Sequence, residues 1–323
     1  MPPRYCTGVV APLFTPALPD GAVDPDSAAG LVDHLAGTGA VRSVFCRSGL
    51  GKMYTFTVDD TKRLARAVVA RAKRRGLGAL VGCAGEWLRR DEGVLPDPGR
   101  YTEQAVALAR HARSLGADAA VLVLPAALIR PGADAHEILF DHVKTVHDAA
   151  GDLPIVLYQA PGLPEAIRLT PAVLTRLRSL PRVVGAKVSS ADDAVMRPLL
   201  DSVRGSDFAF LCGDERYFLS GLRQGAVGVI GEGACIAPSL LAAVERRFRA
   251  GDPAGAERAQ RMVAEAIALK EDMDPSLAGL QRMARRGAKT ALRDRSLKPP
   301  YPDSRIVAFD EALLALEREA AAP

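Results

Sequence analysis

Eight short apolar runs alternate with amphipathic stretches along this chain of 323 residues, and this alternation constrains the fold more than any other feature. Strands that alternate with helices predict a parallel sheet with helices packed outside it. Eight such units close a (β/α)8 barrel, and one barrel routinely uses a chain of this length. We therefore predict an α/β fold of the TIM-barrel type. The runs occupy residues 7–14, 41–47, 78–84, 119–125, 154–160, 183–189, 208–213 and 227–231.

The segments between the runs carry helix signals. Residues 57–75 place apolar side chains on one face, and Thr57 followed by Asp60 resembles a capping box with aspartate in the acidic role. Glycines stand where helices should end, as expected for a left-handed C-terminal residue. These glycines are Gly39, Gly76, Gly116, Gly151, Gly205 and Gly225.

Beyond about Pro253 the pattern becomes wholly helical, with helices expected over 253–273, 276–293 and 308–320. We therefore divide the chain into a barrel catalytic domain, 1–250, and a C-terminal extension of three helices, 251–323. One irregular insertion, residues 87–99, follows the third predicted strand. It emerges on the face where barrels carry their sites. It either covers the site or is an ordinary surface loop.

Charge and cysteine content exclude several classes of protein. The net charge of +4 is spread over arginine-rich helices without a basic stripe interleaved with aromatic residues, which argues against nucleic-acid binding. The N-terminus lacks a signal-peptide pattern, and no apolar stretch reaches the length of a membrane span. The five cysteines have no metal-like spacing, so we expect buried thiols in a reducing cytoplasm.

Lys187 lies inside the sixth apolar run and is one of only eight lysines. Apolar surroundings disfavour the charged form of an amine and lower its pKa, as a nucleophilic lysine requires. A free lysine is less than roughly 0.1 % neutral at pH 7, so the protein must supply that shift. A structural ion pair, or a side chain that faces solvent at the strand end, is the alternative interpretation.

Tyr158 lies near the end of the fifth run. Side chains at the C-terminal ends of barrel strands carry the chemistry, and neighbouring strands are only about 5 Å apart. Tyr158 and Lys187 therefore converge if both point inward. This pairing favours imine chemistry, because imine formation needs a neutral amine and a nearby group that donates and later accepts a proton.

Five segments in order resemble the dihydrodipicolinate synthase / N-acetylneuraminate lyase family of class I aldolases. The opening strand and turn are similar, as are Leu153-Pro154-Ile155-Val156-Leu157-Tyr158-Gln159-Ala160-Pro161 and Val184-Gly185-Ala186-Lys187. Cys212-Gly213-Asp214-Glu215 and Gly225-Ala226-Val227-Gly228-Val229-Ile230-Gly231 complete the series. The resemblance covers nearly the whole chain, which we identify as a divergent member.

The resemblance implies a role for each matching residue. Lys187 aligns with the lysine that forms a Schiff base with a 2-oxo acid, usually pyruvate or a pyruvate-derived aldol. Tyr158 aligns with the tyrosine that relays protons, and Gly213 and Ile230 with residues that line the pocket. The family also implies a homotetramer or dimer and neither a metal nor an organic cofactor.

The carboxylate-binding loop departs from the family pattern. After the second strand the chain reads Cys46-Arg47-Ser48-Gly49-Leu50-Gly51-Lys52, without the family's glutamate. Ser48 has the only hydroxyl in this loop that can replace the family's threonine. A hydroxyl together with backbone N–H groups, here at Gly49, can bind a carboxylate, so we predict that the anion site is kept. We further predict that Arg47 or Lys52 assists in binding the anion. Solvated loop charges explain Arg47 and Lys52 equally well.

Two further departures concern the rest of the substrate. Ala127 stands where the family has a second relay tyrosine, and Leu163 where dihydrodipicolinate synthases have an arginine for the aldehyde's carboxylate. Their loss argues against dihydrodipicolinate synthase itself. Glu232, after the eighth strand, either reaches the pocket or belongs to a tight turn.

We predict a lyase, either an aldolase or a dehydratase, that acts on a 2-oxo acid such as a 2-oxo-3-deoxy sugar acid or a pyruvate-derived aldol. Lys187 forms the Schiff base and Tyr158 relays protons. A binding or sensor protein on the same barrel is the alternative from another class, since one barrel hosts many functions. A third possibility is an enzyme in which Tyr158 and Lys187 act as acid and base without forming an imine.

Overall fold

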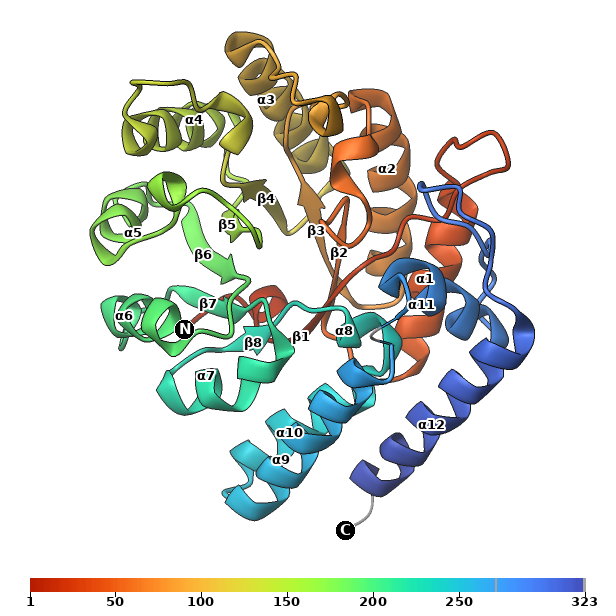
Figure 1. Ribbon diagram of the computed structural model, residues 1–323. Helices are drawn as coiled ribbons and strands as arrows, with labels where there is room; N and C mark the ends of the chain where they lie inside the picture. The colour runs from red at the N-terminus through yellow and green to blue at the C-terminus, as the bar shows by residue number, and fades with distance from the viewer. Residues whose placement is uncertain (271, 322–323) are drawn as a thin grey trace.

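Eight parallel strands form a closed barrel in sequence order, with β8 pairing to β1. The computed structural model describes residues 1–270 and 272–321. Figure 1 shows the strands at the centre and the helices around them. The strands are β1 (Gly8–Pro12), β2 (Ser43–Cys46), β3 (Gly78–Gly82), β4 (Ala119–Val123), β5 (Ile155–Gln159), β6 (Val183–Val188), β7 (Ala209–Cys212) and β8 (Gly228–Val229). All eight predicted strands are confirmed, and each lies within its predicted range.

Helices follow the strands and pack outside the barrel, as the alternation predicts. The outer helices are α1 (Pro25–Gly37), α2 (Val58–Arg74), α3 (Pro98–Leu115), α4 (Ala135–Ala149), α5 (Pro171–Arg178), α6 (Asp193–Val203), α7 (Phe218–Gln224) and α9 (Pro238–Arg249). A short helix, α8 (Gly233–Ile236), lies between β8 and α9. The (β/α)8 barrel is thereby confirmed.

Local sequence explains where these helices begin and end. The Thr57 side chain accepts from the Asp60 amide while the Asp60 carboxylate accepts from the Thr57 amide, so the predicted capping box at α2 is formed. Gly116 ends α3 in the left-handed region at φ 70°, where a side chain is disfavoured. An N-terminal cap such as Thr57 stabilises a helix by about 1 kcal/mol.

The interior of the barrel is a packed apolar core. Every residue of β2, β4 and β5 is buried, and the five cysteines are buried free thiols, as predicted. The strand side chains are mainly valine, leucine and alanine, whose burial drives folding by about 25 cal/mol per Å². Apart from Ser43 at the start of β2, the buried polar side chains of the strands lie near their C-terminal ends; they are Tyr158, Gln159 and Lys187.

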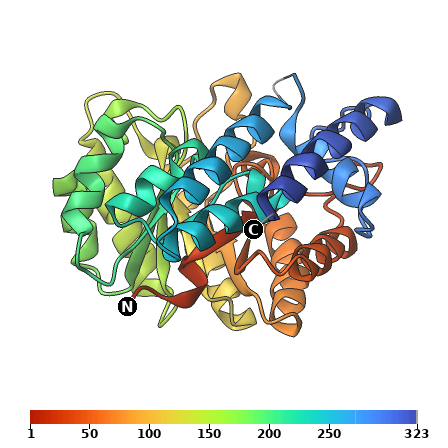
Figure 2. The same ribbon diagram turned by 90° about the horizontal axis from the view of Figure 1, so that it is seen from below.

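Three helices follow the barrel, as predicted: α10 (Pro253–Ala268), α11 (Pro275–Arg285) and α12 (Asp303–Ala321). Figures 1 and 2 both show α10 beside α9, and α12 also packs against α9 and α10. The prediction that the second helix continues to residue 293 is wrong, because Gly287 takes a left-handed φ of 91° just after α11 ends. The last helix begins five residues before the predicted 308. Residue 271, within the first predicted helix, lies outside the described residues.

Over residues 1–270 and 272–321, no helix is both long enough and apolar enough to cross a membrane.

Candidate active site

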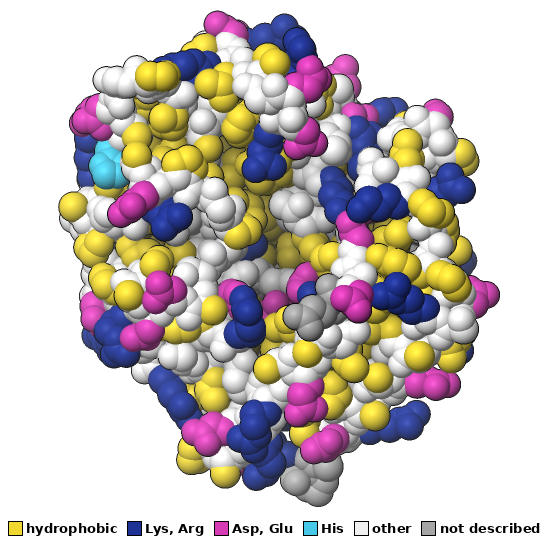
Figure 3. All heavy atoms as spheres, in the orientation of Figure 1, with side chains coloured by type: hydrophobic (Ala, Val, Ile, Leu, Met, Phe, Trp, Pro, Cys, Tyr) yellow, Lys and Arg dark blue, Asp and Glu magenta, His cyan; other side chains and the backbone are white. Residues whose placement is uncertain are grey.

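A cavity of about 820 Å³ opens at the C-terminal ends of the barrel strands. Figure 3 shows this hollow at the centre of the face, with hydrophobic side chains inside and charged side chains around its rim. Residues after β2, β3, β5, β6, β7 and β8 line it, and the end of α10 contributes Ile267 and Lys270. Cavities at this end of a barrel are where enzymes of this architecture carry their chemistry.

Lys187 and Tyr158 meet in this cavity. They are register partners on β6 and β5, and both side chains line the cavity although they are only 5 % and 4 % exposed. The Lys187 Nζ atom lies 4.2 Å from the centre of the Tyr158 ring. The structure therefore brings together the amine and the phenol that the sequence pairs.

Burial sets the electrostatics of the pair. Desolvation lowers the pKa of Lys187 to about 8, against a smaller opposing effect of the Glu215 carboxylate. At pH 7 about a tenth of such an amine is neutral, on the order of a hundredfold more than for free lysine. Burial also raises the pKa of Tyr158 to about 12, partly offset by hydrogen bonding to Ser189. Tyr158 therefore keeps its proton at neutral pH, so it can donate that proton before it accepts one.

Three glycines make room for the polar side chains of the cavity. A Cβ atom at Gly49 would lie 2.8 Å from the Tyr158 hydroxyl oxygen, and one at Gly213 would lie 2.8 Å from Cε of Lys187. A Cβ atom at Gly231 would come within 2.3 Å of the Glu215 carboxyl carbon. All three distances are below normal contact, so these positions hold glycine for steric reasons.

Glu215 is a buried carboxyl group that the sequence analysis did not assign to the site. It follows β7, lines the cavity and accepts a hydrogen bond from the Gly233 amide. Burial, with the Glu232 charge in second place, raises the pKa of Glu215 to about 7. Its position in the segment Cys212–Glu215, already singled out by resemblance, was the signal available in the sequence. Glu232 also lines the cavity, where it forms an ion pair with Lys270.

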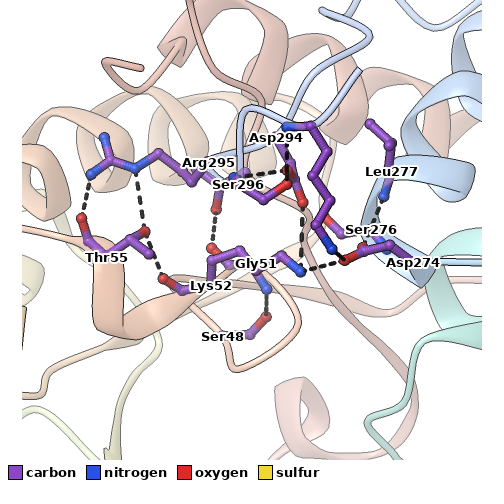
Figure 4. A network of polar contacts seen from close by, with 12 residues as sticks. Ser48, Gly51, Lys52, Thr55, Asp274, Ser276, Leu277, Asp294, Arg295 and Ser296 are labelled. Atoms are coloured by element: carbon purple, nitrogen blue, oxygen red, sulfur yellow. Dashed lines mark hydrogen bonds and ion pairs between the residues drawn. The ribbon is translucent and has the colours of Figure 1, made fainter. Parts of the chain in front are cut away.

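The β2–α2 loop holds its predicted residues in different ways. Gly49 lines the cavity, whereas the Ser48 hydroxyl is buried and accepts from the Gly51 amide at 3.0 Å. Lys52 points to the C-terminal extension, where it lies 2.8 Å from Asp274 and 3.7 Å from Asp294 (Figure 4). Its charge is therefore neutralised there and not offered to a substrate.

Arg47 and Ile230 lie behind the cavity wall and not on it. Arg47 adopts a left-handed φ of 54°, and its buried guanidinium donates to the carbonyls of Ala84 and Gly85. The prediction that Arg47 assists substrate binding is contradicted by this placement, since its donors are directed to the β3 end. Ile230 is fully buried, and the neighbouring Gly231 lines the cavity in its place.

The rim contains residues that sequence reasoning missed. Tyr54 comes from the short helix η2 (Met53–Thr55), and Trp87 and Arg90 come from the 87–99 insertion. That insertion thus contributes to the cavity and is more than a surface loop. Leu163 lines the cavity as well, while Ala127 is buried outside it.

Solved structures with this fold cover nearly the whole chain. YagE, a prophage protein of the dihydrodipicolinic acid synthase family from E. coli K12 solved in complex with pyruvate, matches with a TM-score of 0.80 and 23 % identity, over 96 % of this chain and 98 % of its own. A Ruminococcus gnavus sialic acid aldolase with a mutated catalytic lysine matches with a TM-score of 0.83 and 20 % identity, over 99 % of each chain. At these identities the likeness establishes the fold.

Sequence comparison establishes the class. The protein is an enzyme, a lyase of the class I aldolase type. It belongs to the dihydrodipicolinate synthetase family, whose sequence model matches residues 94–284. The 4-hydroxy-tetrahydrodipicolinate synthase of Phenylobacterium zucineum is 31 % identical over 83 % of this chain and 84 % of its own. The synthase of Hyphomonas neptunium is 29 % identical over 96 % of this chain and 97 % of its own.

Proposed function

We propose that the enzyme cleaves or dehydrates a 2-oxo acid through a Schiff base on Lys187, with Tyr158 as the proton relay. The observation that carries this proposal is the buried Lys187 amine, held 4.2 Å from the centre of the Tyr158 ring at the floor of an open cavity. The pKa of about 8 supports it further, because a neutral amine is the nucleophile. A buried lysine in a purely structural role would be expected to have a carboxylate partner within ion-pair distance.

The chemistry requires little more than these two side chains. The neutral Nζ of Lys187 attacks the ketone carbon. The ketone oxygen takes one proton from the Tyr158 hydroxyl and one from the attacking nitrogen, and it leaves as water. In aldol cleavage, the protonated imine accepts the electron pair of the bond between the carbon next to it and the carbon that bears the substrate hydroxyl. The hydroxyl gives its proton to the deprotonated Tyr158, the carbon that bears it leaves as an aldehyde, and the enamine stays on Lys187. In the dehydratase variant, loss of the carbon-bound proton and of hydroxide follows from the same imine.

The carboxylate of the 2-oxo acid is assigned to the Gly49–Leu50 turn. Both residues line the cavity, and within the described part of the chain neither backbone N–H donates to an acceptor. Two free N–H groups at a turn form an anion-binding concavity. Ser48 supports the turn from below, because its hydroxyl accepts from the Gly51 amide. In this proposal Ser48 supports the turn, whereas the sequence analysis expected its hydroxyl to contact the carboxylate directly.

Borohydride trapping tests the proposal. The protein is incubated with pyruvate and with a panel of longer 2-oxo acids, reduced, and analysed by intact and peptide mass spectrometry. We expect a substrate-dependent adduct on Lys187 that Lys187→Ala abolishes and Tyr158→Phe slows. Lys144→Ala, an exposed lysine on α4 paired with Asp148, is the matched control and should trap normally. A folded protein that traps none of the panel would exclude the imine.

We also propose that the enzyme acts in the cytoplasm as a homodimer or homotetramer, as the family resemblance implies. Light scattering of the purified chain measures this directly. A monomeric mass at micromolar concentration would contradict the assembly without affecting the chemistry, since every residue assigned above comes from one chain.

A further inference from the structure

The rim of the cavity carries a guanidinium supported on two aromatic rings. The Tyr54 and Trp87 rings lie 5.5 Å apart in an edge-on arrangement. The Cζ atom of Arg90 lies 4.5 Å from the centre of the Tyr54 ring and 5.6 Å from that of Trp87. The Trp87 indole is itself fixed, because its N–H donates to the Val94 carbonyl at 2.9 Å. The platform therefore holds Arg90 without using its N–H donors.

Arg90 differs from the other cations of the cavity in lacking an acidic partner. Arg216 pairs with Asp214 at 2.6 Å, and Lys270 pairs with Glu232. Lys187 is the proposed nucleophile. Among residues 1–270 and 272–321, the Arg90 side chain forms neither an ion pair nor a hydrogen bond; its neighbour Arg89 is paired with Glu92. A planar guanidinium with free donors at a cavity rim is suited to a carboxylate.

The rim is separate from the place where the reacting ketone must sit. Lys187 and Tyr158 are buried at the floor, whereas Arg90 is exposed. Tyr54 lines the same cavity as Tyr158, and its ring carries Arg90 at 4.5 Å. The head carboxylate of a 2-oxo acid adjoins the ketone carbon and so remains near the floor. Arg90 is therefore left for the distal half of a substrate.

The cavity wall on the side of Arg90 is apolar. Its residues follow β2 to β5 and are Leu50, Ala126 and Leu163, together with the Tyr54 and Trp87 rings. The paired charged residues of the cavity lie after β7 and β8, where Asp214 pairs with Arg216 and Glu232 with Lys270. A polyhydroxylated chain would leave its hydroxyls without hydrogen-bond partners against such a wall. A hydrocarbon spacer has no polar groups to satisfy and therefore suits this wall better.

Building on the proposed function, we propose that Arg90 on the 87–99 insertion binds a terminal carboxylate carried on an apolar distal half, so that the substrate is a 2-oxo dicarboxylate. The insertion thus determines specificity. The leaving half of an aldol cleavage would be an aldehyde that bears this carboxylate.

Matched pairs of 2-oxo acids test the proposal in the trapping assay. Each pair has equal chain length, with or without a terminal carboxylate, such as 2-oxoglutarate against 2-oxopentanoate and 2-oxoadipate against 2-oxohexanoate. The wild type should reach half-saturation at a concentration at least about tenfold lower for the dicarboxylate in at least one pair, the effect of one charge-assisted hydrogen-bond set. Arg90→Met should remove the preference and leave pyruvate trapping unchanged. Arg90→Lys should restore part of it.

Arg89→Met is the matched control, because Arg89 adjoins Arg90 in the same insertion and does not line this cavity. It should keep the preference. Equal half-saturation for every pair in the wild type, or an unchanged preference in Arg90→Met, would overturn the proposal. An equal loss of pyruvate trapping in Arg90→Met would do so too, since Arg90 would then hold the head carboxylate.

A second measurement separates this proposal from the imine chemistry. Glutarate and adipate cannot form an imine, so their binding to Lys187→Ala by calorimetry reports on carboxylate recognition alone. Binding at least about tenfold tighter than that of pentanoate and hexanoate, lost in Lys187→Ala with Arg90→Met, would support the subsite even if no 2-oxo acid is trapped. Equal affinities would overturn it even if the imine forms.

Discussion

Gly213 lies against the aliphatic stem of Lys187: a Cβ atom at position 213 would stand 2.8 Å from the lysine Cε and 2.5 Å from the Ser189 hydroxyl oxygen. Ser189 in turn hydrogen-bonds to Tyr158. A missing side chain just after β7, the strand next to β6, therefore leaves space for Lys187 and for the Ser189 hydroxyl that contacts Tyr158, the two groups of the proposed reaction. The position is constrained by sterics and not by backbone strain, because its φ is not positive.

Gly213→Ala should reduce the rate of pyruvate-dependent trapping at Lys187 by at least about tenfold, because displacing a reacting group by about 1 Å has effects of this size or larger. The added methyl group pushes the lysine stem and Ser189 away from their positions. The rate is measured by borohydride trapping, with circular dichroism to confirm folding.

Gly37→Ala provides the comparison, since a Cβ atom at Gly37 meets nothing within 4 Å and α1 lies outside the barrel. It should trap pyruvate at the wild-type rate. A Gly213→Ala protein as fast as Gly37→Ala would show that the lysine tolerates crowding.

Lys187→Met should stabilise the protein at pH 7 by at most about 3 kcal/mol, the value that corresponds to lowering the pKa from 10.5 to about 8. The unfolded chain holds the lysine proton more tightly than the folded chain does. The wild type therefore gains stability as the pH rises from about 8 to 10.5, and the advantage of Lys187→Met shrinks over the same interval. Urea unfolding at pH 7 and pH 10 measures both values. Equal stability at pH 7 would mean that the amine is solvated.

The barrel could be predicted from the sequence because its signal is repeated. Eight apolar runs spaced by amphipathic segments leave few alternatives, so errors of a residue or more at each strand end do not alter the topology. The residues that end a helix are less certain: α11 stops at Arg285 although apolar side chains continue beyond it. Gly287 was the local signal for that stop.

That Tyr158 and Lys187 meet in one cavity could be predicted from the sequence, whereas the residues of the cavity rim could not. Tyr158 and Lys187 follow from two adjacent strands, whose geometry is fixed by the sheet. Trp87 and Arg90 belong to an irregular loop, whose path no periodicity describes. The ion pair of Lys52 with Asp274 joins residues 222 positions apart and depends on how the extension packs. Arg47 was misplaced because its left-handed backbone turns the side chain behind the wall.

Glu215→Gln should shift the pH dependence of imine trapping to lower pH by about half a unit or more. The Glu215 carboxylate raises the pKa of Lys187, so its removal lets the amine become neutral at lower pH. The change is read as the midpoint of trapping rate against pH, with pyruvate saturating at each point.

Glu137→Gln is the control, because Glu137 is an exposed carboxylate on α4 paired with Arg176. Its midpoint should match that of the wild type. Stability gives a second measure: burial raises the pKa of Glu215 from 4.5 to about 7, so the wild type loses stability as the pH rises from about 4.5 to 7. Glu215→Gln should lack this loss. An unmoved midpoint would place Glu215 outside electrostatic reach of the amine.

Lys52→Met should raise the pyruvate concentration for half-maximal trapping severalfold and destabilise the fold by about 1–3 kcal/mol, because it leaves the fully buried Asp294 carboxylate without its cation. The lysine ties the β2–α2 loop, and with it the Gly49–Leu50 turn, to the C-terminal extension (Figure 4). Lys298→Met tests the specificity of this tie, since Lys298 is 63 % exposed and lies 4.0 Å from the same Asp274. An exposed pair of this kind contributes less than about 1 kcal/mol, so Lys298→Met should change neither quantity appreciably. If both variants behave alike, the extension does not hold the turn through Lys52.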